Sequence, residues 1–79
     1  MSHIVTIFDN QVEVYSNPTV STNMIATKRS VIDLLNEDNV YAKHPEHFSL
    51  FILGTWDEVS GALKPYDAPV LAFNFWDLK

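Results

Sequence analysis

The chain has 79 residues, of which 47% are hydrophobic and 13% aromatic, and ten acids outnumber five bases to give a formal net charge of −5. This length predicts a single domain over residues 1–79 with a small core, and the hydrophobic content excludes a disordered chain. Cysteine is absent, which excludes disulfides and cysteine–zinc sites and indicates a reducing compartment.

The first ten residues, MSHIVTIFDN, carry neither a basic region nor a long apolar run, so we expect no signal peptide and no membrane contact. A cytoplasmic protein is the expectation. The acids are spread along the chain, and this acidic balance argues against strong nonspecific DNA binding, which needs clustered Lys and Arg. A local basic patch remains compatible with it.

Two short strands are predicted near the amino terminus. Residues 3–8 are rich in β-branched and aromatic side chains, and residues 12–15 alternate between apolar and polar. We expect these strands to pair as a hairpin around residues 9–11. The Ser-Asn-Pro segment at 16–18 breaks the second strand, and residues 19–20 are expected to form a short edge piece.

One amphipathic helix is predicted over about residues 24–37. Ser21, Thr22 and Asn23 precede it, and each can accept a hydrogen bond from the first free amides of a helix. The helical period places a group of apolar side chains on one face: Met24, Ile25, Val31, Ile32 and Leu35. The helix is expected to end at residues 38–39.

A polar loop at residues 40–48 should follow, because Pro45 bars the helix from continuing. Residues 49–56 form the next predicted strand. Its apolar side chains lie on both faces, which predicts either a central strand or a strand with one face covered by a partner subunit. A hairpin turn over residues 57–61 ends it, with Gly61 at a position that favours a positive φ.

Residues 62–64 are expected to return along the hairpin, with Pro65 ending the pairing and residues 66–69 acting as a second break. Residues 70–76 alternate again and predict a long, apolar terminal strand. An exposed edge of this kind promotes aggregation, so we expect this strand to be inserted in the sheet or paired with another chain.

The predicted fold is therefore α+β: an antiparallel sheet of four to five strands with one amphipathic helix packed on one face, in the order β-β-α-β-β-β. The ten aromatic residues exceed what so small a core needs. Together with the terminal strand, they predict a homodimer or a higher homo-oligomer.

The inventory of reactive groups predicts no enzyme and no cofactor. His44, Glu46 and His47 are metal-type ligands at close spacing, but no fourth ligand lies nearby, so we expect loop-capping roles and no metal. Asp57 and Glu58 suit a turn better than an acid–base pair. The sequence has no nucleophile–base pattern and no glycine-rich phosphate loop.

A weak basic cluster is the candidate nucleic-acid contact. Lys28 and Arg29, extended by Lys43 and Lys64, could meet phosphates. The alternative is ordinary helix chemistry, in which Arg29 pairs with Asp33 and Lys28 lays its methylenes on apolar surface.

Exposed aromatic side chains could stack on unpaired bases. The candidates are Tyr15, Phe51, Trp56 and Trp76. Packing in the core or in a dimer interface explains the same residues, and this is the interpretation that we favour.

The segment from His44 to Gly61 reads His-Pro-Glu-x-Phe-x-Leu-Phe-x-Leu-Gly-x-Trp-Asp-x-x-Ser-Gly. It resembles the hallmark segment of the small nonstructural protein of gokushoviruses, which are single-stranded DNA phages of the Microviridae. His47 replaces a usual acidic residue, and Trp56 replaces a more usual Phe. The resemblance maps the hallmark onto these positions: His44, Pro45, Glu46, Phe48, Gly54, Trp56, Asp57 and Gly61.

The resemblance implies a phage accessory protein in the host bacterial cytoplasm that acts in single-stranded DNA synthesis or genome packaging. It would bind single-stranded DNA, the phage replication initiator or procapsid proteins. In the DNA-binding form of this hypothesis, Lys28, Arg29 and Lys43 meet phosphates and Trp56 stacks on a base. The alternative is a homo-oligomeric protein–protein interaction module without nucleic-acid binding, which the net charge of −5 favours.

Overall fold

The computed structural model describes residues 1–79. Its strands are β1 (Ser2–Asp9), β2 (Val14–Tyr15), β3 (Thr19–Ser21), β4 (Phe48–Trp56) and β5 (Leu63–Asn74). Its helices are α1 (Met24–Leu35) and α2 (Val40–Lys43), with the 3₁₀ turns η1 (Pro45–His47) and η2 (Phe75–Leu78). None of these helices has the length and apolarity that a bilayer span requires.

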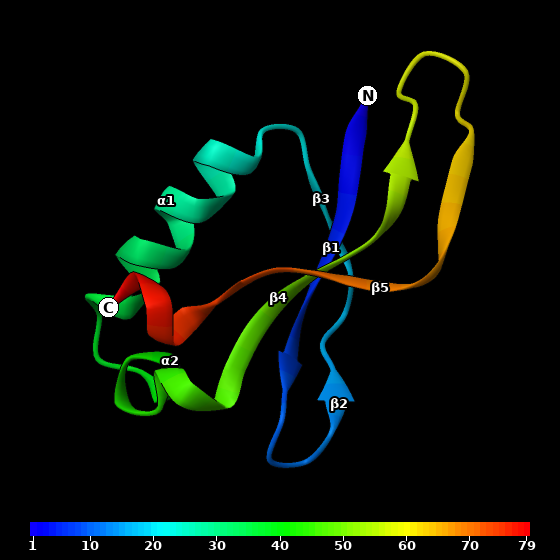
Figure 1. Cartoon of the computed structure of the whole chain (residues 1–79). Helices are drawn as coiled ribbons and strands as arrows, with labels where there is room; N and C mark the ends of the chain where they lie inside the picture. Colours follow the sequence, from blue (N-terminus) through cyan, green and yellow to red (C-terminus); the bar gives the residue numbers. More distant parts are fainter.

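All strands belong to one antiparallel sheet in the order β2-β1-β4-β5, and β3 pairs with the amino-terminal half of β1. Helix α1 lies along one side of this sheet (Figure 1). The predicted α+β class, the four-to-five-stranded antiparallel sheet and the single long helix are confirmed. Strand β4 pairs with β1 and β5, which confirms that it is central.

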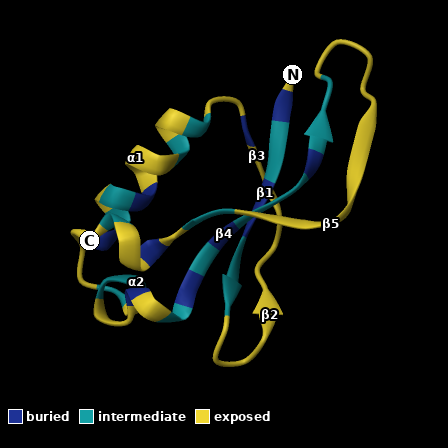
Figure 2. Ribbon diagram, in the orientation of Figure 1, coloured by how far each residue is buried: buried dark blue, intermediate teal, exposed yellow.

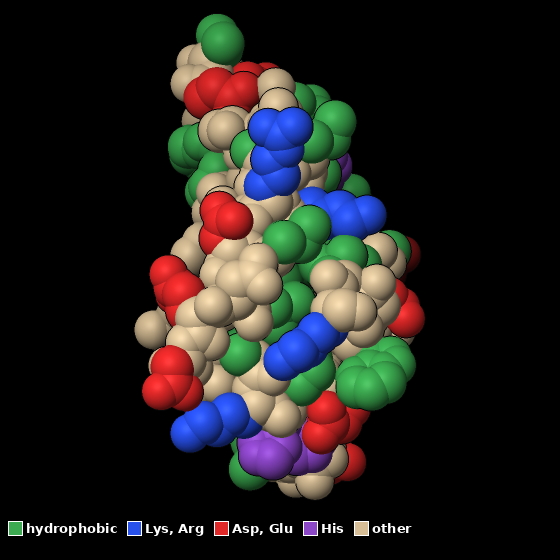
Figure 3. All heavy atoms as spheres, turned by 90° about the vertical axis from the view of Figure 1, so that its left-hand side faces the viewer, with side chains coloured by type: hydrophobic (Ala, Val, Ile, Leu, Met, Phe, Trp, Pro, Cys, Tyr) green, Lys and Arg blue, Asp and Glu red, His purple; other side chains and the backbone are tan.

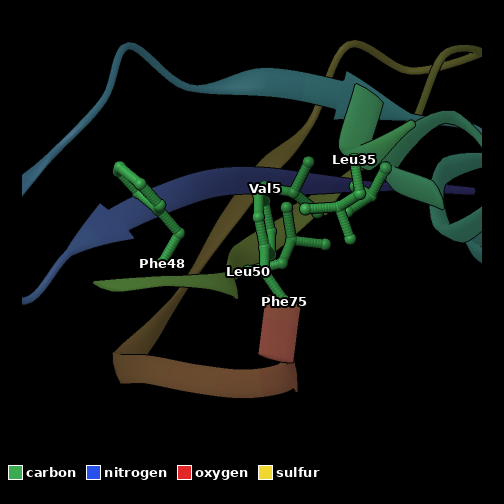
Figure 4. Close-up of a cluster of buried hydrophobic side chains, with 6 residues drawn as sticks. Val5, Leu35, Phe48, Leu50 and Phe75 are labelled. Atoms are coloured by element: carbon green, nitrogen blue, oxygen red, sulfur yellow. The ribbon is translucent and has the colours of Figure 1, made fainter. Parts of the chain in front are cut away.

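The core lies between α1 and the sheet and is closed by η2. Its buried apolar side chains come from four elements, β1, α1, β4 and η2: Val5, Val31, Leu35, Phe48, Leu50 and Phe75. Figure 4 shows Val5, Leu35, Leu50 and Phe75 converging from β1, α1, β4 and η2. Phe75 is the most deeply enclosed of them, with 0% of its surface exposed.

Helix α1 begins at Asn23, one of the three predicted capping residues. Its side-chain oxygen accepts hydrogen bonds from the amides of Ile25 at 2.9 Å and Ala26 at 3.3 Å. These bonds satisfy donors that a helix otherwise leaves free in its first turn. The helix ends at Leu35, two residues before the predicted end at 37.

The apolar face of α1 is narrower than predicted. Val31 and Leu35 are buried and Met24 packs against the core, but Ile25 is 71% exposed. The inclusion of Ile25 in the core face was therefore wrong. The buried face is centred on Met24, Val31 and Leu35, and Ile25 lies about 100° around the helix from Met24, beyond the reach of the sheet.

Residues 40–48 were predicted as a loop, but most of them form α2 and η1. Asn39 organises this segment, because its side-chain oxygen accepts from the amide of Ala42 at 2.9 Å and its NH₂ donates to the carbonyl of Leu34 at 2.8 Å. One side chain thus caps α2 and adds a donor to the carbonyl of Leu34, which also accepts the amide of Glu37 at 3.2 Å at the end of α1.

The first hairpin has a longer turn than predicted. Strand β2 spans only Val14–Tyr15, and Glu13 takes a left-handed conformation with φ 57°. The turn is tied to a distant segment, since the amide of Asn10 donates to the carbonyl of His47 at 2.9 Å. Residues 10–13 form the turn, in which the carboxylate of Asp9 accepts the amide of Gln11 at 2.9 Å, so Val12 lies outside the ladder that the alternation had suggested.

Pro65 does not end the β4–β5 pairing, contrary to the prediction. It pairs in register with Gly54, and the ladder resumes where Val70 pairs with Ile52 after an irregularity. The amide of Asp57 donates to the carbonyl of Ala62, so alternation makes the Gly54–Pro65 pair a non-bonded one. The missing N–H of Pro65 therefore faces the outer edge of the sheet, where it interrupts no bond.

The terminal strand ends at Asn74, not at residue 76, because the chain turns there to insert Phe75 into the core. Lys79 then donates a hydrogen bond to the carbonyl of Ala42, which ties the carboxyl terminus to α2. Strand β5 lies at the edge of the sheet and is exposed over most of its length (Figure 2). Its pairing with another chain remains a prediction.

Candidate interaction surfaces

The hallmark residues of the hairpin have structural roles in this molecule. A Cβ atom added at Gly54 would lie 2.8 Å from the Cα atom of Pro65 and would overlap the carbonyl oxygen of Lys64. Gly54 therefore permits the close approach of β4 and β5. Gly61 has φ 75°, and its amide donates to the carbonyl of Asp57 at 2.8 Å, as expected for a bulged hairpin turn.

The acidic pair at this turn builds the turn and anchors the amino terminus. The carboxylate of Asp57 accepts from the amide of Val59 at 2.9 Å, and this bond, with further bonds from Ser60, lowers the pKa of Asp57. Glu58 lies 2.7 Å from the amino group of Met1 and accepts the hydroxyl of Ser2 at 2.7 Å. Both carboxylates are therefore occupied by structural contacts.

The residues predicted to bind nucleic acid are not brought together. Lys28 and Arg29 are exposed on α1, whereas Lys43 lies in α2 and pairs with Asp38 at 3.9 Å. Trp56 ends β4, and Lys43 lies near the start of that strand. Because a strand advances about 3.3 Å per residue, Lys43 and Trp56 are separated by roughly 25 Å.

The charges on the α1 side of the molecule are mixed. Figure 3 shows its Lys and Arg side chains scattered among acidic, apolar and neutral groups, without a continuous basic patch. The predicted alternative for Arg29, an ion pair with Asp33, is absent from the ion pairs of the structure. Lys28 and Arg29 thus remain the only exposed pair of adjacent bases.

Three aromatic rings gather on the sheet face opposite α1. Phe8 and Tyr15 pair across β1 and β2 with ring centroids 4.6 Å apart, and Phe51 of β4 lies 5.8 Å from Phe8 and 5.7 Å from Tyr15. Val5 and Leu50 point toward α1, and strand side chains alternate between faces, so these rings point away from it. We call this surface the aromatic face.

The aromatic face is only partly covered by its own chain. Tyr15 is 43% exposed, Leu71 opposite Phe51 is 49% exposed, and none of the three rings belongs to the core cluster. Phe51 meets Phe8 and Tyr15 at interplanar angles of 82° and 83°, so the rings pack edge to face. They form a cohesive apolar patch, with no pair of parallel rings between which a base could insert.

The sequence identified Tyr15 and Phe51 as exposed aromatics but missed Phe8. Trp56 and Trp76 lie elsewhere, in β4's far end and in η2. The predicted turn over residues 9–11 would pair Phe8 with Val12, and only the longer turn of the structure places Phe8 opposite Tyr15. Without β4, however, nothing in the hairpin places Phe51 beside them.

His44, Glu46 and His47 form one group of metal-type ligands around η1, with one ligand atom from each residue within 4.8 Å of the others. Pro45, between them, is buried and anchors the turn.

The family model described as "Phage ORF5 protein" matches residues 2–78 of the chain. No curated protein and no solved structure shows a significant match to it. The match spans all but the first and last residues, and it confirms the resemblance to a phage protein family. The chain therefore belongs to the phage ORF5 protein family.

Proposed function

We propose that this phage protein is a nonstructural accessory protein of a small single-stranded DNA phage of the gokushovirus type, within the Microviridae. It acts in the host bacterial cytoplasm, in single-stranded DNA synthesis or genome packaging, by binding a replication or procapsid protein. The family match and the resemblance of residues 44–61 to the gokushovirus hallmark support the phage assignment.

The aromatic face is the observation that carries the choice of a protein partner. It is apolar and partly exposed, and it contains tyrosine and phenylalanine, which are favoured in protein interfaces. None of the five bases lies in β1, β2 or β4, the strands that carry it. A surface for unpaired bases requires a positively charged groove beside its aromatic rings, and this face lacks one.

Binding between the full chain and the purified replication initiator or procapsid proteins of the same phage tests this proposal, measured by biolayer interferometry. We expect one of these proteins to bind, and we expect Tyr15→Ala and Leu71→Ala each to weaken binding by about tenfold, as for a central interface residue. Trp76→Ala is the matched control, because Trp76 is 61% exposed and lies in η2, away from the aromatic face. Absence of binding, or equal losses in all three variants, contradicts the proposal.

Direct DNA binding through α1 is a second candidate, favoured by one observation. Lys28 and Arg29 are adjacent, exposed and free of ion pairs. Fluorescence anisotropy with a labelled single-stranded oligomer across a salt series tests it, with duplex DNA as the control. Binding that weakens with salt and with Lys28→Ala or Arg29→Ala would support this candidate, and absence of binding at low salt would exclude it.

A second copy of the chain is the remaining partner that the surface suggests, as a homodimer or higher oligomer without nucleic-acid binding. Strand β5 presents an open edge with Leu63 58% and Val70 49% exposed. Sedimentation equilibrium of the chain without any partner tests this alternative, because an oligomer has a mass above the 9.0 kDa of one chain. A monomer at all concentrations would remove it.

A further inference from the structure

The 3₁₀ turn η1 brings two histidines and a carboxylate to one point on the surface. A 3₁₀ helix has about three residues per turn, so side chains three positions apart lie above one another. The rings of His44 and His47 accordingly stack with centroids 4.9 Å apart. The Oε1 atom of Glu46 lies 3.6 Å from Nδ1 of His44 and 3.7 Å from Nε2 of His47.

The backbone that carries these side chains is held from several sides. Pro45 is buried, and the amide of His47 donates to the carbonyl of His44 at 3.0 Å. The turn after β1 contributes two more bonds, from the amide of Asn10 to the carbonyl of His47 at 2.9 Å and from its side chain to the carbonyl of Glu46 at 3.1 Å. The backbone is therefore fixed, and only rotations of the side chains can change the distances between the three ligand atoms.

The donor distances are close to those of a tetrahedral metal site. With metal–nitrogen and metal–oxygen bonds near 2.0–2.2 Å, tetrahedral ligand atoms lie about 3.3–3.5 Å apart. The two distances at Glu46 exceed this by a few tenths of an ångström, and all three ligand atoms lie within 4.8 Å of one another. The rings are inclined by only 12°, and a bound metal lies in the plane of each ring, so at least one imidazole must rotate about χ2.

The ligand types select the metal. Two imidazoles and one carboxylate suit Zn²⁺ and its first-row neighbours, whereas Mg²⁺ and Ca²⁺ prefer oxygen ligands alone. The sequence offered no fourth ligand, but Zn²⁺ sites with three protein ligands keep a water in the fourth position. His44 and Glu46 are exposed and His47 is partly exposed, so water can reach the site.

We propose that His44, Glu46 and His47 form a surface site for one divalent transition-metal ion of the Zn²⁺ type. The site is formed within one turn of the chain and does not depend on the aromatic face or on any partner.

Isothermal titration of the untagged, metal-stripped full chain with ZnCl₂ tests this proposal, with Co²⁺ absorption as a second readout of ligand geometry. We expect one Zn²⁺ per chain with micromolar affinity. His44→Ala, His47→Ala and Glu46→Gln should each weaken binding by about tenfold or more, because each removes one of three donors.

His3→Ala is the matched control, since His3 lies in β1 outside this group and its removal should leave Zn²⁺ affinity unchanged. Circular dichroism of each variant separates loss of a ligand from loss of the fold. Absence of binding at millimolar Zn²⁺ would overturn the proposal. Equal affinity in the His44→Ala, His47→Ala double variant, or a loss of affinity in His3→Ala, would do the same.

Discussion

At the scale of single residues, the smallest side chains and the most buried one set the geometry of the carboxyl-terminal half. At Gly54 the backbone of β5 lies too close to leave room for a Cβ atom, and Phe75 fills the space between the sheet and α1. Neither residue has chemistry of its own. Their importance follows from the space that one leaves free and the other occupies.

Gly54→Ala should destabilise the fold by about 1–3 kcal/mol, because the new methyl group meets backbone atoms of Lys64 and Pro65 that cannot rotate away. Gly61→Ala is the comparison. Its Cβ atom would meet nothing within 4 Å, but its φ of 75° would still strain an alanine by about 1 kcal/mol. Urea unfolding of both variants measures the difference, and equal losses would show that the close approach at Gly54 is not real.

Phe75→Ala should lower the free energy of unfolding by about 3–5 kcal/mol, since its ring is fully buried. The neighbouring Trp76→Ala should change it by less than about 0.5 kcal/mol, because Trp76 is mainly exposed. If Phe75→Ala fails to fold, Phe75→Leu supplies the comparison with a loss below about 1.5 kcal/mol. A larger loss for Trp76→Ala than for either Phe75 variant would contradict the placement of η2.

The contact between Glu58 and the amino terminus should show opposite pKa shifts at its two ends. The amino group of Met1 and the hydroxyl of Ser2 lower the pKa of Glu58 below its ordinary 4.5, and Glu58 raises the pKa of that amino group above 8.0. Glu58 therefore stabilises the fold above pH 4.5 and loses this contribution as the pH falls through its lowered pKa. The amino group stabilises it below pH 8.0 and loses this as the pH rises through its raised pKa.

NMR titration of the Glu58 side chain measures the first shift directly. We expect a pKa below 4.5 in the wild type, and a value closer to 4.5 after Ser2→Ala, which removes one hydrogen bond to the carboxylate. In Glu58→Gln the pKa of the amino group should return toward 8.0. An unshifted Glu58 would mean that the turn and the amino terminus do not meet in solution.

At the scale of elements, the local signals of the sequence predicted the strands and the long helix. They did not predict where strand pairing stops, because that depends on the neighbouring strand. The alternation in residues 49–56 and the capping side chains before Met24 are local, and both predictions were confirmed. Pro65 suggested a break because local rules cannot show which edge of the strand its missing N–H faces. That depends on the register with Gly54, which only the folded sheet defines.

The same limit explains the misplaced end of the chain and the candidate site. Residues 70–76 alternate as a strand should, but burying Phe75 against α1 outweighs the pattern and turns the chain into η2. The aromatic face joins Phe8, Tyr15 and Phe51 from three strands. Sequence periodicity gives the face of each strand, yet not which strands are neighbours.

Asn23→Ala should shorten α1 and cost about 1 kcal/mol, because the amides of Ile25 and Ala26 lose their acceptor. Thr22→Ala, one residue earlier, removes an exposed side chain with no hydrogen bond to the helix and should be close to neutral. Thermal unfolding followed by circular dichroism compares the two. A larger effect at Thr22 would place the start of the helix one residue earlier.

At the scale of the whole molecule, the features divide between two faces. The face that carries α1 encloses the core, while the opposite face bears the aromatic cluster, and β1, β2 and β4, which carry its three rings, contain none of the five bases. The molecule is elongated, with axes of 40, 24 and 18 Å. The β4–β5 hairpin extends beyond the end of helix α1 (Figure 1). A net charge of −5 on such a molecule suits a protein partner better than a polyanion.

The most direct test of a protein partner at the aromatic face is a ¹⁵N chemical-shift titration, which a chain of 9.0 kDa permits. Each purified replication or procapsid protein, and a single-stranded oligomer at low salt, would be added in turn. We expect shifts from a phage protein at Phe8, Tyr15 and Phe51, and none from the oligomer. Shifts from the oligomer centred on Lys28 and Arg29, with the aromatic face unaffected by every protein, would contradict this.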